Sequence, residues 1–493
     1  MISETASDGV SDQCSSARSY MSCTSADRNM KKACNFLDSL AVSGNPEAQY
    51  LYGLFLYTGT EATQDKKSAM DLFSLSASAG NQDAHLLLSE FEKNNNDESV
   101  MNDLIMLKFK GEQNDTDACA KLFDLYDNGK IPVKKDHKVA VRWYTVCAEE
   151  DNVSAQNTIG FMYLMGKGVS KDKEKAVFWL KKAAESGNSE AMFHLAEMYD
   201  TGMCYTEPNL KEAIKWYQMS ADSGYADAQY SLAGIHMMQK TKYFDTAEAV
   251  KLLEKAAEQG HHEAQHQLGI MCAYGQGTKR NVDNAIKWLE AACEGGFQQA
   301  MVDYANMRFE GEVLEKDYVL AAKWFQKAAD LCNGYAQYAL ACMYGNGYYF
   351  PQDEKMAAKW FKEAAEMGEV NSQYCLGCFY YEGRGVTKDN SEAAVWFEQA
   401  AEQGHPGAKS FLGMLTVAGK GVDQDISTGL QYLNEAADAG YYEAQYYLGK
   451  LYMDGQFTER NIPRAKKYLS LAAKQGDTDA IALLNKIKIE KMH

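Results

Sequence analysis

The sequence predicts an all-α fold, built as an array of about twelve helix-pair repeats of 36 residues each. Three observations support it: a short motif recurs at that spacing, its apolar positions follow the period of a helix, and the prolines avoid the helical segments. A small residue anchors each motif, and the mean spacing of the anchors is 36 residues. The anchors are Ala48, Ala84, Ala118, Ala155, Ala191, Ala228, Ala264, Ala300, Ala336, Ser372, Ala408, Ala444 and Ala480.

The first helix of each unit follows from apolar residues at fixed distances from the anchor. After Ala191, for example, Leu195, Met198 and Tyr199 follow at four, seven and eight residues, which places them on one helical face. A glycine recurs eleven residues after most anchors, where it predicts the end of the helix. These glycines are Gly59, Gly129, Gly166, Gly202, Gly275, Gly311, Gly347, Gly383, Gly419 and Gly455.

In seven units an aspartate stands seventeen residues after the anchor, where it predicts the N-cap of a second helix. These aspartates are Asp65, Asp172, Asp245, Asp317, Asp353, Asp389 and Asp425. All seven tryptophans fall into one slot of this second helix, which predicts a core position: Trp143, Trp179, Trp216, Trp288, Trp324, Trp360 and Trp396. The six prolines lie before helix starts or in loops, since a proline inside a helix costs about 3 kcal/mol or more.

The full pattern, AQYxLGxxYxxGxGVxxDxxxAxxWxxxAAExG, is most complete at 155–187 and 372–404. It resembles the Sel-1-like repeat family, a relative of the tetratricopeptide repeats, over about residues 46 to 491. The resemblance implies a right-handed superhelical α-solenoid of antiparallel helix pairs, whose first helices line a concave side. It also implies a scaffold or adaptor, because many members look like adaptors in signalling, cell-envelope or degradation complexes.

Four segments are expected along the chain. Residues 1–26 are Ser-rich and predicted to be disordered. Residues 27–45 and 480–493 are expected to be capping helices, which a solenoid needs at its ends, on either side of the array at 46–479. Two units of the array are degenerate, near 84–117 and 228–246. The first loses its loop glycine and the second has Gln239 in that place, so local irregularity is expected in both.

The charge of the chain argues against two classes of partner. Its 68 acidic residues exceed its 50 basic ones, which gives a net charge of −18. Nucleic acids and anionic membranes require a positive surface, so neither is an expected partner. No stretch approaches the roughly 20 apolar residues of a membrane span. The N-terminus MISETASDGV lacks the features of a secretory signal, and a cytoplasmic location is therefore expected.

One motif suggests metal chemistry. His262, Glu263 and His266 spell H-E-x-x-H, in which two histidines one helical turn apart bind zinc and the glutamate acts as a base. Glutamate, alanine and glutamine are ordinary residues of the repeat here, and His262 falls at the turn before the helix. The favoured interpretation is therefore structural. No catalytic residue, cofactor or metal site is predicted, and the chain is not expected to be an enzyme.

Partner binding is predicted on the first helices, at the positions three, six and ten residues after the anchor. These positions vary most from unit to unit and share a face opposite the packing stripe. In the central units they are His194, Glu197, Thr201, Gln267, Ile270, Tyr274, Asp303, Asn306 and Glu310. Solvated surface is the competing interpretation for each of them.

The sequence thus predicts a scaffold or adaptor that binds a peptide or protein in a concave groove. The acidic charge favours a partner with basic segments, because complementary fields steer encounter. One alternative is a secreted effector or regulator that uses the same groove. A less favoured alternative is a hydrolase, with zinc at His262 and His266 or with the β-lactamase-like activity of some cysteine-rich relatives. Those relatives carry cysteines eight positions apart, a spacing absent from this sequence.

Overall fold

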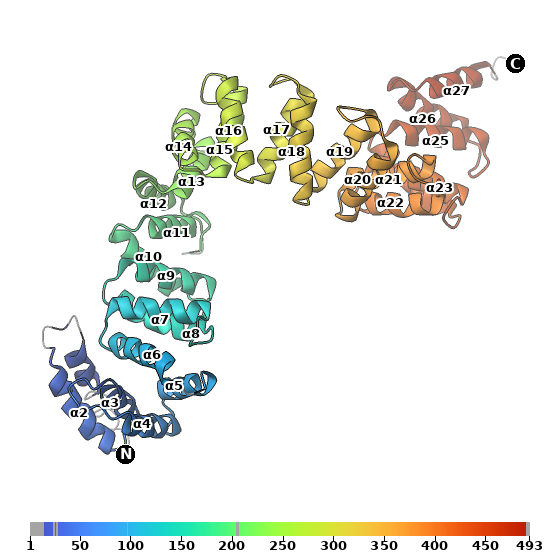
Figure 1. Cartoon of the computed structure of the whole chain (residues 1–493). Helices are drawn as coiled ribbons and strands as arrows, with labels where there is room; N and C mark the ends of the chain where they lie inside the picture. The colour runs from blue at the N-terminus through green and yellow to red at the C-terminus, as the bar shows by residue number, and fades with distance from the viewer. Residues whose placement is uncertain (1–13, 23–24, 26–27, 96, 204–206, 490–493) are drawn as a thin grey trace. The chain divides into compact units, whose positions relative to one another are not determined.

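The computed structural model describes residues 14–22, 25, 28–95, 97–203 and 207–489, and every regular element in these ranges is a helix (Figure 1). The chain divides into two compact units, Met1–Phe244 and Asp245–His493. Within each unit, most successive helices pack against each other as hairpins. The predicted all-α solenoid is confirmed. We call the first helix of each repeat helix A and the second helix B.

The first unit opens with a helix at residues 14–21, which is followed by the B helix α2 (Met30–Val42). Helices A and B then alternate along the unit. They are α3 (Pro46–Thr58), α4 (Lys66–Ser78), α5 (Gln82–Lys93), α6 (Glu98–Gly111), α7 (Thr116–Asn128), α8 (His137–Glu149), α9 (Val153–Met165), α10 (Lys173–Glu185), α11 (Ser189–Asp200), α12 (Leu210–Asp222) and α13 (Ala226–Met237).

The second unit begins with a B helix and ends with an A helix. Its helices are α14 (Thr246–Glu258), α15 (His262–Tyr274), α16 (Val282–Glu294), α17 (Gln298–Glu310), α18 (Tyr318–Asp330), α19 (Gly334–Asn346), α20 (Glu354–Glu366), α21 (Val370–Glu382), α22 (Asn390–Glu402), α23 (Pro406–Ala418), α24 (Ile426–Asp438), α25 (Tyr442–Asp454), α26 (Ile462–Lys474) and α27 (Thr478–Ile489).

The predicted helix signals lie where the helices begin and end. Each of the seven aspartates is an N-cap whose side chain accepts a hydrogen bond from a backbone N–H of the first turn. Nine of the ten predicted glycines are C-caps in left-handed backbone, as at Gly275 with φ 72°. The tenth, Gly202, lies one residue beyond the C-cap of α11. Local capping therefore fixes the length of most helices.

The anchors and the small residues after them bring helices A and B into close contact. Ala264 is fully buried. A Cβ placed on Gly269 would lie 2.7 Å from Cγ of Leu289 on α16, closer than real side chains pack. Any larger residue at position 269 would push the two helices of this repeat apart.

The tryptophan slot differs from its prediction. Trp143, Trp216 and Trp324 are buried, but Trp179, Trp288, Trp360 and Trp396 are only half-buried. In these four units the next residue is the buried one, as Leu289 is after Trp288. Trp143 and Trp216 stand 25 residues after their anchors, whereas the half-buried tryptophans stand at 24. The single slot is therefore two neighbouring positions. The residue at 25 is buried in all seven units, whereas a tryptophan at 24 is buried only at Trp324, where Phe325 is buried as well.

The N-terminal segment also differs from its prediction. Residues 14–21, expected within a disordered tail, form a helix that buries Cys14, Ala17 and Met21 in the core of the first unit. These three residues lie on one helical face, although the segment around them is rich in serine. Residues 1–13, 23–24 and 26–27 lie outside the described part of the chain.

Both degenerate units are irregular. In the first, α6 packs on α7 and contacts α3, and the ring of Phe109 lies 5.0 Å from that of Phe55. In the second, α13 ends at Met238 in extended backbone, with φ −74° and ψ 96°, instead of at a left-handed glycine. Where the loop glycine is lost, α13 thus ends without a left-handed cap.

Candidate partner-binding surface

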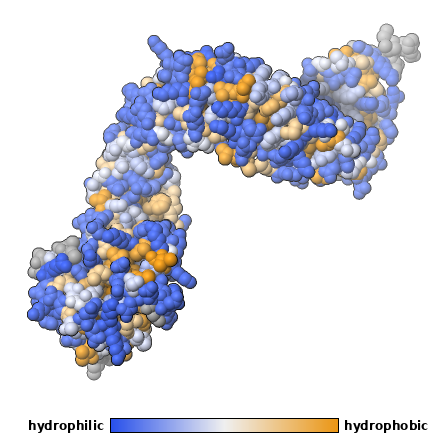
Figure 2. Space-filling model, in the orientation of Figure 1, coloured by the Kyte–Doolittle hydropathy of each residue, from blue (hydrophilic) through white to orange (hydrophobic). Residues whose placement is uncertain are grey.

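Several A helices of neighbouring repeats contact one another within a unit. In the first unit α9 contacts α11, and in the second unit α21, α23, α25 and α27 contact each other in succession. Side chains on these helices can therefore form a continuous strip inside a unit. Figure 2 shows hydrophilic residues over most of the visible face of each unit, with small hydrophobic patches between them.

The first unit holds three of the nine predicted partner-binding residues, His194, Glu197 and Thr201. His194 is half-buried, with Nδ1 3.3 Å from the Glu197 carboxylate and its ring 4.9 Å from that of Phe161. Glu197 and Thr201 are exposed, and the Thr201 hydroxyl donates to the Glu197 backbone carbonyl. Helix α11 thus presents a carboxylate and an imidazole beside an aromatic ring.

The second unit holds the other six. Gln267, Ile270, Asp303 and Asn306 are half-buried, whereas Tyr274 and Glu310 are exposed. Tyr274 lines a shallow hollow of about 170 Å³ with Ala273, Arg280, Glu312 and Val313. None of the six is buried in the core. Their exposure is consistent both with partner binding and with a merely solvated surface.

Two side-chain hydrogen bonds connect three successive A helices in the second unit. His266 of α15 lies 2.9 Å from Asp303 of α17, measured from Nε2 to Oδ2. The Tyr335 hydroxyl on α19 donates to Oδ1 of Asn306 on α17, at 3.2 Å. We call the six predicted residues of this unit together with His266 and Tyr335 the second-unit A surface. It combines carboxylates, amides, one imidazole and exposed aromatic rings.

Sequence reasoning missed Tyr335 and an aromatic cluster formed by α21 and the starts of α23 and α25. Tyr335 is 43% exposed and directly precedes its anchor. Tyr374 stacks on His405 with ring centroids 4.4 Å apart, and its hydroxyl lies 2.9 Å from that of Tyr441. Tyrosine recurs two residues after several anchors, as at Tyr338 and Tyr374, and that recurrence could have indicated the aromatic cluster.

Burial sets the protonation of the cluster. It raises the pKa of Tyr335, Tyr374 and Tyr441, so these phenols stay neutral donors. It lowers the pKa of His405, whose Nδ1 accepts a hydrogen bond from the backbone N–H of Ala408. His405 is thus a helix N-cap in its neutral form.

The H-E-x-x-H residues make contacts within the repeat array. Nδ1 of His262 lies 3.2 Å from Oε1 of Gln265, and a Cβ on Gly295, the C-cap of α16, would clash with the His262 ring. His266 is bonded to Asp303, as described above. Across the described residues, no group of three or more His, Cys, Asp or Glu side chains is placed to hold a metal ion.

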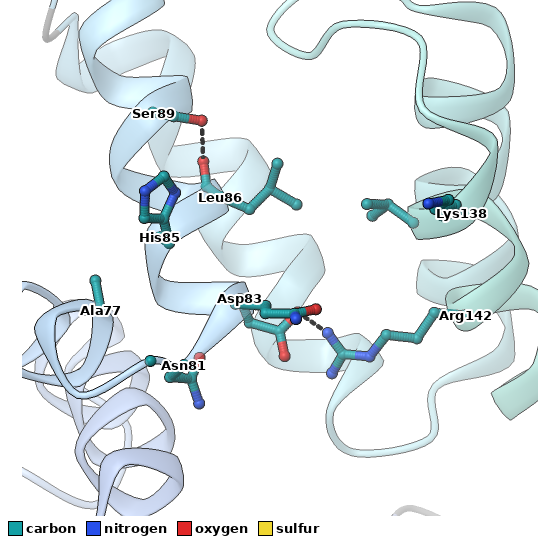
Figure 3. A pocket seen from close by; sticks show the side chains of 11 residues that line it. Ala77, Asn81, Asp83, His85, Leu86, Ser89, Lys138 and Arg142 are labelled. Carbon is teal, nitrogen blue, oxygen red and sulfur yellow. Dashed lines mark hydrogen bonds and ion pairs between the residues drawn. The ribbon is translucent and has the colours of Figure 1, made fainter.

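A cavity of about 400 Å³ lies in the first unit between α5 and α8 (Figure 3). Helix α5 and the turn before it contribute Asn81, Asp83, His85, Leu86 and Ser89. Helix α8 contributes the facing side chains, Lys138, Val139 and Arg142. Arg142 and Asp83 form an ion pair across it.

The helix hairpins, their anchors and their caps define an α-solenoid repeat protein. Eleven segments match the family model of the Sel1 repeat: 46–81, 116–152, 153–188, 189–225, 226–261, 262–297, 298–331, 334–369, 370–405, 406–441 and 443–477. The chain belongs to the Sel1 repeat family, and the predicted resemblance is confirmed. The matched segments leave out 82–115, where α5 and α6 depart from the regular hairpin.

Solved structures share this architecture. The crystal structure of c5321, a protective antigen of uropathogenic Escherichia coli displaying an SLR fold, is 26% identical. Its alignment covers 93% of this chain and 90% of c5321, with a TM-score of 0.63. A Sel1 repeat protein from Oxalobacter formigenes is 28% identical, over 66% of this chain and 93% of that protein, with a TM-score of 0.51.

Two curated relatives are similar over shorter stretches. An uncharacterized protein of Neisseria meningitidis serogroup B is 31% identical over 151 residues, which is 31% of this chain and 32% of that protein. The chitin synthase regulator SKT5 of Saccharomyces cerevisiae is 31% identical over 132 residues, which is 26% of this chain and 19% of SKT5. The matches therefore span about a third and a fifth of these relatives. Within the described helices of this chain, none is both long and apolar enough to cross a bilayer.

Proposed function

We propose that the protein is a non-catalytic interaction scaffold or adaptor that binds a peptide or protein segment along its A helices. The observation that carries this proposal is the second-unit A surface. There, hydrogen bonds from His266 to Asp303 and from Tyr335 to Asn306 hold polar and aromatic side chains in a half-exposed strip. Aromatic side chains offer large contact area at low entropic cost, and ordered polar groups add direction.

The proposed partner carries basic segments. Glu310, Asp303 and, in the first unit, Glu197 place carboxylates on the A helices of a chain with a net charge of −18. Opposite charges on a partner would raise the rate of encounter and would lose effect as salt screens them. Membership of the Sel1 repeat family supports a role in protein interaction. The cytoplasm is the proposed location, which suits the free thiols of the ten described cysteines.

The test is affinity capture from lysate with purified wild-type protein and two charge-reversal variants. Glu310→Lys alters the exposed end of the second-unit A surface. Glu366→Lys is the matched control, because that glutamate is 57% exposed on the B helix α20. We expect Glu310→Lys to reduce capture of its specific partners at least several-fold, and Glu366→Lys to leave it unchanged. Equal capture by all three proteins, or capture that does not weaken with salt, would contradict the proposed surface.

A further inference from the structure

Five charged side chains of the first unit form an alternating row. Nε of Arg18 lies 2.9 Å from the Glu47 carboxylate, and the same guanidinium pairs with Glu112. The other oxygen of Glu112 lies 3.0 Å from Nη2 of Arg142, which in turn pairs with Asp83. The order is therefore Glu47, Arg18, Glu112, Arg142 and Asp83. Figure 3 shows the last pair of this row at the edge of the cavity.

Arg18 differs from the other four in its origin. It comes from the helix at residues 14–21, whereas the others belong to the repeat array. Without Arg18, the row would hold three carboxylates and one guanidinium. The Glu112 side chain is only 2% exposed, and a buried carboxylate is costly unless cations and hydrogen bonds compensate its charge. The array thus leaves a position that requires a cation.

The geometry selects a guanidinium for that position. A guanidinium presents several N–H donors in one plane and can bind two carboxylates at once, as Arg18 does with Glu47 and Glu112. Burial opposes the charge of Arg18, but the carboxylates of Glu112 and Glu47 outweigh it and raise the pKa of the guanidinium. The position therefore favours a permanently charged, planar side chain.

A second observation points to a site for polar ligands at this place. Tyr50 is 1% exposed, and its hydroxyl has no hydrogen-bond partner among the described residues. Burial, followed by the charge of Glu112, raises the pKa of this phenol, and Arg142 and Arg18 act on it in the opposite direction. A neutral hydroxyl without a hydrogen-bond partner thus lies in the field of the charged row.

Besides its ion pairs, the segment that supplies Arg18 packs on the array through a short helix, whose Tyr20 ring lies 6.3 Å from that of Phe36. Its helix has eight residues, too short to be stable in isolation. It buries Cys14, Ala17 and Met21, and the amide of Asn114 donates to the Ser22 hydroxyl at its end. When this segment leaves, Arg142 still pairs with Glu112 and Asp83. The charged row then keeps one of its two guanidinium groups.

We propose that Glu47 and Glu112 form a binding site for an arginine on a helix of a partner protein, and that residues 14–22 are a built-in ligand which this helix displaces. The partner helix carries small residues at the positions of Cys14 and Ala17, arginine at the next position and an apolar residue at the position of Met21. The site uses none of the nine residues of the proposed A-helix surfaces. It therefore adds a second interaction site to the proposed function, at which the chain's own residues 14–22 compete with the partner helix.

The test measures binding of a fluorescent peptide of residues 14–22 to the full-length chain by anisotropy. Ala17→Gln in the chain should release its own segment, because a longer side chain cannot fit where Ala17 is fully buried. We expect the Ala17→Gln chain to bind the peptide at least tenfold more tightly than the wild type. An Arg18→Gln peptide should bind that chain at least tenfold more weakly. Equal affinity of the two chains, or of the two peptides, would overturn the proposal.

Matched substitutions test the carboxylates. Added to the Ala17→Gln chain, Glu47→Gln should weaken binding of the peptide several-fold, since the Glu47 carboxylate contacts the arginine. Glu98→Gln is the control and should have no effect, because Glu98 is 67% exposed on α6 and pairs with Lys66. If both substitutions act alike, the peptide does not occupy the Arg18 position.

Hydrogen exchange on the wild-type chain keeps the proposal testable even if Ala17→Gln misfolds. Excess isotope-labelled peptide should remove protection from the chain's own residues 14–21 and leave α3 protected. Protection of that segment that persists at saturating peptide would identify it as a permanent cap. Partner capture through the second-unit A surface should be unchanged by Arg18→Gln, which separates failure of this proposal from failure of the proposed function.

Discussion

His266 of α15 and Asp303 of α17 lie 2.9 Å apart and join two A helices of the second unit. The Gln299 amide also donates to both oxygens of this carboxylate, at 3.1 Å. Asp303 therefore has two separable properties, a charge that a basic partner would contact and an acceptor position that organises its neighbours.

Asp303→Asn separates these properties. The amide keeps an acceptor oxygen in a side chain of the same shape but removes the charge. We expect the thermal unfolding midpoint to change little and capture of a basic partner to fall with a shallower salt dependence. Capture equal to that of the wild type would mean that the charge of Asp303 does not contribute.

Leu289 and Trp288 give adjacent substitutions with different expected costs. Leu289 is fully buried against Gly269, so Leu289→Ala should lower the free energy of unfolding by about 2–5 kcal/mol. Trp288 is half-buried, with the Lys287 ammonium 4.2 Å from its ring centroid, and Trp288→Ala should cost less. Denaturant unfolding of both variants checks the order. A larger loss of unfolding free energy for Trp288→Ala would show that the indole contributes more to the packing than Leu289 does.

The repeat made most of the fold predictable, because its signals act within a few residues. Asp245 caps α14 and Gly275 ends α15 through contacts inside one turn of helix, and such contacts can be read from spacing alone. The distinction between Trp288 and Leu289 was not readable. It depends on a rotation of helix B by a single residue, and both side chains are apolar.

The N-terminal helix could not be predicted from composition. Its Cys14, Ala17 and Met21 form a weak stripe among serines, and Arg18 reaches Glu112 from 94 residues away in the sequence. The irregular packing of α6 on α3 creates that contact. On the A helices, the predicted positions are on the surface, but their hydrogen bonds to His266 and Tyr335 depend on the distance between repeats, which spacing within one repeat does not give.

The buried glutamine after the anchor should stabilise the junction between repeats. The amide of Gln265 donates to the carbonyl oxygen of Ala257 at the end of α14, at 3.0 Å, and Gln156, Gln229, Gln373 and Gln445 make the same bond eight residues back. Gly260 N–H also donates to the Ala257 oxygen, so this acceptor keeps a partner when the glutamine is replaced. Gln265→Leu should therefore cost only about 0.5–1.5 kcal/mol.

Gln431→Leu is the control for that measurement, because Gln431 is exposed on α24 and bonds only to Glu435 among the contacts described for its side chain. Chemical denaturation should show a loss for Gln265→Leu and little change for Gln431→Leu. Similar curves for the two variants would mean that the bond between repeats adds nothing to stability.

His405 should make the stability of the second unit depend on pH. Burial lowers its pKa below the ordinary value of 6.5, and its Nδ1 must be unprotonated to accept the Ala408 N–H that caps α23. The unfolded chain binds a proton at higher pH than the folded one. Protonation of His405 therefore does not affect the free energy of unfolding well above pH 6.5. Stability then falls as pH decreases through 6.5 toward the folded pKa. His405→Asn keeps a capping side chain without this titration, as Asn333 does for α19. Unfolding midpoints of the two proteins between pH 8 and pH 5 should therefore diverge, with the wild type losing more; parallel curves would show that His405 does not titrate in this range.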